Sequence, residues 1–189
     1  MEIIKINYKL SKTVVNFNEI KEESKEMREF LRNINTGKTK LAGFYNKAFA
    51  IAHCQVSETP YSFFVVSDEV VNEKMFEKNT IINPQILDAQ GDENIKEYDE
   101  PCLSFPFRSQ KKVKRFDKIR VQYQIASSWL GGLKMIEREL TGITSEIFQH
   151  EYDHTQARNI FFHTDNPRAW WQLAGEHGEL MQSRETEVI

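Results

Sequence analysis

The stretch QHEYDHTQ, residues 149–156, places two histidines four positions apart, with a glutamate directly after the first. In an α-helix, residues i and i+4 project from the same face, so the imidazoles of His150 and His154 can bind one cation while Glu151 stands beside it. This spacing predicts a helix that carries a catalytic metal. Such a metal usually has three protein ligands and one position open to water, so the stretch by itself is an incomplete site.

The flanking residues predict that this helix runs from about residue 142 to residue 158. Thr141, directly before the predicted start, is an N-cap type of residue. One face of the helix would carry Ile143, Ile147, His150 and His154. The two histidines therefore share their face with two isoleucines.

Spacing alone does not identify the third ligand. The candidates are the carboxylates, the two cysteines and the remaining histidines, His53, His163 and His177. In metalloproteases that extend HExxH with a third histidine, that histidine lies in the same short stretch. Here TQARNIFF follows His154, and His163 lies too far along the chain for that pattern. The extended protease pattern is therefore disfavoured.

Composition indicates one globular domain, residues 1–189, in the cytoplasm. A chain of 189 residues can bury most of its apolar surface around a single core, and a net charge of -3 favours neither DNA nor a membrane as partner. The N-terminal MEIIKINYKLSK lacks the apolar region of a signal peptide, and no run approaches the ~18 apolar residues of a membrane span. Two cysteines, Cys54 and Cys102, are too few for a disulfide framework.

Patterns along the rest of the chain predict an α+β fold, with antiparallel β-sheets around the central metal-binding HExxH helix. NEIKEESKEMREFLRN, residues 18–33, predicts an amphipathic N-terminal helix. Extended segments are predicted in YSFFVVSDEVV (61–71), on both sides of AQGDEN (89–94), in KRFDKIRVQYQIA (114–126) and in SSWLGGLKMIEREL (127–140). Four residues of the 114–126 segment would alternate inward: Ile119, Val121, Tyr123 and Ile125. Asn166 and Pro167 predict the start of a C-terminal helix over residues 167–182.

A second motif, EPCLSFP at residues 100–106, selects Cys102 when it is taken together with HEYDH. The pair resembles the peptide deformylases, whose hallmark segments run G-x-G-L-A-A-x-Q, then E-G-C-L-S, then H-E-x-D-H. The segment IINPQIL (81–87) also resembles a strand of that family. The first hallmark is replaced by AFAIAHCQ (48–55), so Ala48, Ala50 and His53 depart from the pattern while Gln55 remains, and Pro101 replaces the glycine before the cysteine.

The resemblance implies that Cys102, His150 and His154 bind one divalent metal. The family often uses Fe(II), and Zn(II), Ni(II) or Co(II) can occupy such sites. It further implies that Glu151 transfers protons while the Gln55 amide and the Leu103 backbone N–H stabilise the oxyanion. The reaction implied is removal of the formyl group from N-formylmethionyl nascent peptides, with release of formate.

The resemblance also implies a substrate groove and a structural ion pair. The residues expected to contact substrate are Ala50, Tyr98, Pro101, Ile143 and Ile147. Glu100 and Arg115 are expected to form the ion pair. Asp153 is either a partner that orients a ligand or a charge on the outer face of the helix. Beside this groove, Cys54 is interpreted as a packed thiol and His53 as a solvated imidazole.

Two other functions remain open at this point, an HExxH metallopeptidase of broader specificity and a non-catalytic relative that binds formylated peptides. An open, polar substrate pocket near Tyr98, Ile143 and Ile147 would favour the metallopeptidase. The protein is expected to be a monomer. A basic segment, residues 108–120, has two interpretations, a transient contact with the ribosome or a solvated edge strand that uses lysines against aggregation.

Overall fold

The computed structural model describes residues 10–39, 47–89, 94–105, 111–127 and 131–160. Its helices are α1 (Lys21–Asn35), α2 (Asp68–Asn72) and α3 (Ile143–Thr155), with 3-10 turns η1 (Phe17–Glu19) and η2 (His53–Gln55). Its strands are β1 (Ala50–Ala52), β2 (Phe63–Val66), β3 (Thr80–Ala89), β4 (Ile95–Glu100), β5 (Lys111–Phe116), β6 (Lys118–Ala126) and β7 (Leu133–Thr141). In these ranges no helix combines the length and apolar character needed to cross a bilayer. The C-terminal helix predicted over residues 167–182 lies outside the described residues.

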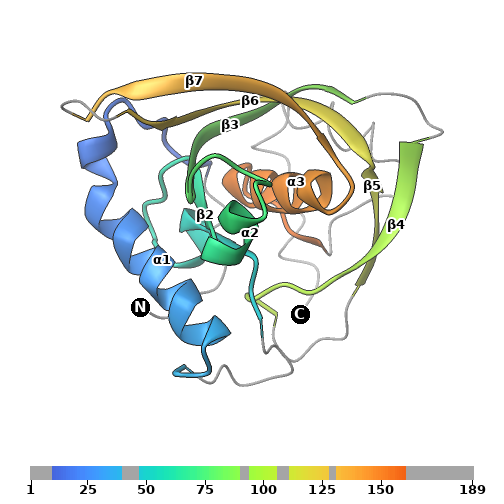
Figure 1. Cartoon of the computed structure of the whole chain (residues 1–189), viewed down its shortest axis with the longest axis horizontal. Helices are drawn as coiled ribbons and strands as arrows, with labels where there is room; N and C mark the ends of the chain where they lie inside the picture. Colours follow the sequence, from blue (N-terminus) through green and yellow to red (C-terminus); the bar gives the residue numbers. More distant parts are fainter. Residues whose placement is uncertain (1–9, 40–46, 90–93, 106–110, 128–130, 161–189) are drawn as a thin grey trace, which may run out of the picture.

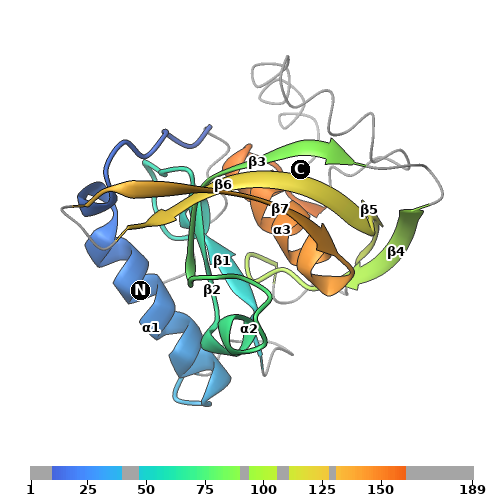
Figure 2. The same cartoon turned by 45° about the horizontal axis from the view of Figure 1, so that its top comes forward.

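The strands form two antiparallel sheets around α3, which confirms the predicted α+β class. The larger sheet has the strand order β1-β2-β3-β6-β7, and β4 pairs with β5 in a smaller one. Figure 1 shows α3 at the centre of the molecule, inside the curve of β3, β6 and β7, with α1 at one side. In Figure 2 the long β6–β7 ribbon passes α3 and leads toward β4 and β5. The predicted metal-binding helix is thus the central element.

Helices cover both faces of the sheet at β1 and β2, and the residues of β2 alternate between them. Phe64 packs in a core cluster with Phe148 of α3, whereas Phe63 packs in a second cluster with Met27 and Leu31 of α1. All four residues of β2 are buried, because neither face of this part of the sheet meets water. The amphipathic helix α1 begins three residues later than predicted, because η1 comes before it.

The inward alternation predicted for β6 is confirmed. Ile119, Val121, Tyr123 and Ile125 are buried, while the residues between them are half-buried or exposed. This face packs toward α3, where Tyr123 lies 6.0 Å from Phe148 between ring centroids. The returning strand β7 is also present as predicted, and it pairs with β6 along the whole of β6.

The prediction of one extended segment over residues 61–71 is wrong in its second half. Strand β2 ends at Val66, and the next residues fold into the short helix α2. Asp68 and Glu69 lie in the first turn of α2, where carboxylates interact favourably with the helix dipole. Asp68 also accepts hydrogen bonds from Arg28 and Arg32 of α1 at 2.9 and 2.8 Å. These contacts with α1 outweigh the β propensity of the two valines in α2.

The segment predicted as one strand over residues 114–126 is two strands that belong to different sheets. The chain changes sheets at Asp117, whose side chain accepts a hydrogen bond from Tyr98 and pairs with Lys96. The backbone carbonyl of Asp117 accepts a hydrogen bond from the N–H of Gly142 at 2.8 Å. This break brings the ends of β5 and β7 to the start of α3.

The helix α3 begins after Gly142, and Thr141 is not its N-cap, because Thr141 is the last residue of β7. Gly142 has a φ of 58° and a ψ of -137°, a backbone conformation that an L side chain rarely adopts. The glycine allows the chain to turn directly from β7 into α3. This turn points the HEYDH face of the helix toward the segment that follows β4.

Several basic side chains of residues 112–120 pair across strands with carboxylates. Three such ion pairs are Lys112 with Glu97, Lys118 with Glu139, and Arg120 with Glu137. Arg115 is buried, and Arg108 lies outside the described residues. This pairing favours the interpretation of a solvated strand over that of a ribosomal contact.

Candidate metal centre and active site

The three ligand atoms expected for the metal lie within 4.8 Å of one another. His150 and His154 come from successive turns of α3, and Cys102 lies two residues after the end of β4. The Nε2 atoms of the two histidines are 3.2 Å apart, and Cys102 Sγ lies 3.5 Å from His154 Nε2. Cys102 and His154 are buried. The structure therefore contains a Cys/His/His site that could hold a metal. His163 and His177 lie outside the described residues.

Hydrogen bonds at the other ring nitrogens orient both imidazoles. His154 Nδ1 donates to the backbone carbonyl of Arg158 at 3.0 Å, and His150 Nδ1 donates to Glu100 Oε2 at 2.8 Å. With the proton on Nδ1, each Nε2 presents a lone pair to the centre of the cluster. Partners of this kind fix the tautomer and the ring orientation of histidines that bind metals.

The donor set fits a divalent cation. Two nitrogen lone pairs that face each other at 3.2 Å repel each other unless a positive charge lies between them. Burial raises the pKa of the Cys102 thiol, but positive charge on His154 and His150 lowers it to about 5, and a cation bound between the three side chains would favour the thiolate in the same way. One thiolate and two imidazoles suit several divalent transition metals.

Arg115 is fully buried and joins the metal centre to the body of the protein. It donates to both carboxylate oxygens of Glu100, at 2.7 and 2.8 Å, so the ion pair expected between these residues is present. It also donates to Asp153, which forms a second ion pair with Arg158 at 3.0 Å. Asp153 is buried, so the alternative that places it on the outer face of the helix is wrong. Burial alone would raise the pKa of Glu100, but Arg115 and His150 lower it to about 2.

Glu151 is buried beside the cluster, and its Oε2 has no hydrogen-bond partner in the described part of the chain. A buried carboxylate oxygen without a partner is costly, so it points to a ligand or a water at this position. Burial raises the pKa of Glu151 above its usual range, although His150 and His154 oppose the shift. A carboxylate with a raised pKa is suited to both accept and deliver a proton.

The side chain of Gln55 is held with its amide nitrogen directed toward the segment around Cys102. Its Oε1 accepts a hydrogen bond from the Ala52 N–H at 2.9 Å. Its Nε2 donates to the hydroxyl of Ser104 at 3.0 Å and lies 3.9 Å from Cys102 Sγ. The Ser104 contact was not predicted, although Ser104 belongs to the motif that identified Cys102. Leu103 lines the pocket next to this site.

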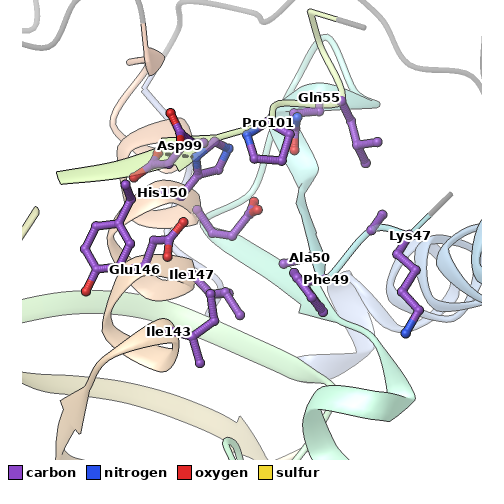
Figure 3. Close-up of a pocket in the computed structure, with 15 residues that line it drawn as sticks. Lys47, Phe49, Ala50, Gln55, Asp99, Pro101, Ile143, Glu146, Ile147 and His150 are labelled. Carbon is purple, nitrogen blue, oxygen red and sulfur yellow. Dashed lines mark hydrogen bonds and ion pairs between the residues drawn. The ribbon is translucent and has the colours of Figure 1, made fainter. Parts of the chain in front are cut away.

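A pocket of about 380 Å³ opens beside Glu151 and His150 (Figure 3). All five residues expected to contact substrate line it: Ala50, Tyr98, Pro101, Ile143 and Ile147. In Figure 3, Ile143, Ile147 and His150 project from α3, with Ala50 and Phe49 across from them and Pro101 and Gln55 above. A volume of this size suits one amino-acid side chain with adjoining backbone.

Sequence reasoning missed Glu146, which also lines this pocket from α3. It lies four residues before His150 and three after Ile143, so helical spacing alone would have placed it on the pocket side. Its neighbourhood differs from that of Glu100, because no hydrogen bond or ion pair engages its carboxylate in the described ranges.

Gln149 and Ser145, also missed, attach α3 to the end of β5. Gln149 Oε1 accepts from the Phe116 N–H at 3.2 Å, and Gln149 Nε2 donates to the Phe116 carbonyl at 2.8 Å. The Ser145 hydroxyl donates to the same carbonyl at 2.7 Å. Both side chains are buried, so these bonds fix the position of the helix on which the histidines stand.

Replacing Gln149 with Leu should lower the free energy of unfolding by about 1–3 kcal/mol, because the buried Phe116 N–H loses its acceptor. Chemical denaturation measured by circular dichroism gives this difference. Gln85→Leu, at an exposed position of β3, is a control, for which we expect a change within about 0.5 kcal/mol. Equal stability of Gln149→Leu and wild type would mean that these hydrogen bonds do not anchor α3.

His53 and Cys54 are both packed in the interior. Cys54 donates from its thiol to the His154 carbonyl at 3.2 Å, as expected for a packed cysteine. The prediction that His53 is solvated is wrong, because it is buried against Phe63 and its Nδ1 accepts from the Tyr61 N–H at 3.0 Å. Burial lowers the pKa of His53 to about 4. The neutral imidazole therefore acts as a structural acceptor.

Comparison with known proteins gives consistent matches. The chain matches the family described as polypeptide deformylase over residues 4–170. It is 38% identical over 74 residues to a peptide deformylase of Thermotoga neapolitana, which covers 39% of this chain and only 40% of that relative. It is 33% identical over 127 residues to a peptide deformylase of Aquifex aeolicus, covering 66% of this chain and 68% of the relative. The crystal structure of peptide deformylase from Thermotoga maritima superposes with a TM-score of 0.65 at 25% identity, covering 86% and 92% of the two chains.

Proposed function

The chain belongs to the polypeptide deformylase family, and on that premise we propose that it removes the formyl group from N-formylmethionyl peptides and releases formate. The observation that carries the proposal is the Cys102, His150 and His154 cluster, with the unpartnered buried carboxylate of Glu151 beside it. The pocket that opens from this cluster supplies a place for the first side chain of the peptide.

We propose that Cys102, His150 and His154 hold one divalent ion per chain, with Fe(II) as the native metal and Zn(II), Ni(II) or Co(II) as alternatives. A bound ion supplies Lewis acidity, which lowers the pKa of water from about 15.7 toward about 7 in the best cases. These ligands are held in place by a buried network, in which Glu100 fixes the His150 ring and Arg115 and Asp153 fix the helix that carries it. We further propose a cytoplasmic location, since both free cysteines suit a reducing compartment, and we propose that the protein acts as a monomer.

In the proposed reaction Glu151 moves the protons. Its Oε2 takes a proton from the attacking water as the water oxygen bonds to the formyl carbon. The carbonyl oxygen becomes negative, and the Gln55 amide N–H and the Leu103 backbone N–H donate to it. The C–N bond then breaks, Glu151 passes the proton to the departing amine nitrogen, and formate and the free amine leave. Ala50 and Pro101 border the peptide backbone, while Tyr98, Ile143 and Ile147 surround the first side chain.

The test of the function is an anaerobic assay of formate released from a formyl-Met tripeptide by the metal-loaded protein. We expect release that depends on both the protein and the metal. Release no faster than that given by the metal-free protein would contradict the proposal.

Replacing Gln55 with Leu should lower kcat/KM for formyl-Met peptides by about 10²–10³-fold, the range for losing one oxyanion donor. Because Gln55 is not a ligand, the metal content should stay that of wild type, as elemental analysis would show. A loss within about threefold would mean that the amide does not meet the oxyanion.

A second candidate is a metallopeptidase of broader specificity, and one observation favours it. The pocket is open at Ile143, which is 41% exposed, and it contains the carboxylate of Glu146. Chromatography of unformylated peptides incubated with the metal-loaded protein distinguishes the two functions. Cleavage of internal peptide bonds without formate release from formylated peptides would favour the peptidase.

A further inference from the structure

The pocket beside the metal centre contains a carboxylate that the proposed reaction does not use. Glu146 stands on α3 one turn before His150, between the apolar side chains of Ile143 and Ile147. Figure 3 shows it projecting from α3 below His150 and above Ile143, on the side of the helix that lines the pocket. It is half-buried, and no cation of the described residues pairs with it. Within the described part of the chain, the carboxylate is therefore left to water or to a ligand.

The other charges around the pocket do not neutralise Glu146. Lys47 pairs with Glu69 at 3.0 Å and so is already engaged. Glu100 is satisfied by Arg115, and Asp99 at the pocket adds a further carboxylate. Among the described residues Glu146 therefore has no paired cation, and at its end of the pocket it favours a positively charged ligand group.

Loss of water is the main cost of filling this pocket, because Glu146 is already half-buried. An apolar side chain that filled the pocket would remove more water from Glu146 and leave it without a compensating contact. An ammonium group would replace the lost hydration with a charge-assisted hydrogen bond.

The walls of the pocket suit a long side chain with a charged end. Ile147 is buried and offers an apolar surface for a methylene stem, and Tyr98 adds an aromatic ring. Ile143 is 41% exposed, so the far end of the pocket is open to water. A lysine side chain can pack its stem on these residues while its ammonium reaches Glu146 and remains partly hydrated.

We propose that Glu146 determines the specificity of this pocket, so that a first residue with a cationic side chain is preferred over an apolar one of similar length. This inference rests on the proposed function, because the pocket is assigned to the first side chain of a formylated peptide. It assigns formyl-peptides that begin with lysine or a similar amine as a substrate class, besides those that begin with methionine.

The test compares two tripeptides that differ mainly in one ammonium group, formyl-Lys-Ala-Ser and formyl-norleucyl-Ala-Ser. In the metal-loaded wild type we expect a higher kcat/KM for the lysyl peptide. In Glu146→Leu the ratio of lysyl to norleucyl kcat/KM should fall by about tenfold or more, the scale of a charge-assisted hydrogen bond. For formyl-Met-Ala-Ser the same variant should show a higher kcat/KM than wild type, because an apolar side chain no longer desolvates a carboxylate. In Glu146→Gln the lysyl to norleucyl ratio of kcat/KM should lie between those of wild type and Glu146→Leu.

Glu139→Gln is the matched control, since Glu139 is an exposed carboxylate of β7 that pairs with Lys118 away from the pocket. It should leave the lysyl to norleucyl ratio within about twofold of wild type, because exposed charges are screened by solvent. A ratio in Glu146→Leu within twofold of wild type, with active enzyme, would overturn the inference and leave the deformylase function standing.

Binding supplies a second readout that does not need turnover. Calorimetry on zinc-loaded Glu151→Gln, with and without Glu146→Leu, measures the dissociation constants of both peptides. We expect Glu146→Leu to weaken binding of the lysyl peptide by about tenfold relative to binding of the norleucyl peptide. The same result, together with a metal-loaded wild type that releases no formate, would contradict the deformylase function and support the pocket assignment. If the ratio of the two dissociation constants is the same with and without Glu146→Leu, the assignment is overturned.

Discussion

Replacing Glu151 with Gln should lower formate release by about 10²-fold or more, the usual scale for loss of a general acid and base. Gln keeps the shape of Glu and much of its hydrogen bonding, but it cannot take a proton from water. Because Glu151 lies beside the three ligands and is not one of them, the variant should keep its fold and its metal. Rate measurements with formyl-Met peptides, together with elemental analysis, separate these effects.

Two outcomes would contradict the role of Glu151. Turnover equal to wild type would mean that another group moves the proton. Loss of metal together with loss of structure would mean that Glu151 is a structural residue. Glu139→Gln is again the control, because it makes the same chemical change at an exposed position.

Replacing Cys102 with Ala should remove the metal, and with it formate release. The change leaves two imidazole donors, and two donors hold a divalent ion much less tightly than three when one of the three is a thiolate. The ion retained after dialysis, measured by elemental analysis, should fall from about one per chain toward zero.

Cys54→Ala is the matched control for this experiment. Cys54 is also a buried thiol, and it bonds to the backbone of His154, but it is not one of the three convergent ligands. We expect the control to retain the metal. Retention of a full equivalent by Cys102→Ala, at wild-type affinity, would rule out Cys102 as a ligand.

The parts of the site that sequence predicted are those in which spacing and geometry correspond directly. Two residues four apart on a helix must share a face, so the convergence of His150 and His154 followed from the helix alone. The prediction that Cys102 lies next to this pair depended on the resemblance to a family, because no local rule relates a residue after β4 to a residue of α3. The ion pair of Glu100 with Arg115 rested on the same resemblance.

The parts that sequence missed depend on contacts between distant segments. The helix α2 was predicted as strand, because the packing of Asp68 against two arginines of α1 cannot be inferred from DEVVN. The break at Asp117 is a change of sheet within one continuous pattern of alternation. The position of Glu146 on the pocket side of the helix, by contrast, could have been predicted from its spacing to Ile143 and His150. Only the structure showed that no cation accompanies it.

Cys102 and His154 are 52 residues apart along the chain, so a metal bound to both would link two distant segments. In the unfolded chain these ligands are far apart, so the ion binds the native state almost alone and its binding energy adds to the stability of the fold. By mass action, free metal at a hundred times its dissociation constant adds about 2.7 kcal/mol. The melting temperature of this protein should therefore rise with the concentration of free metal. A chelator should lower it, because it removes the ion that stabilises the native state.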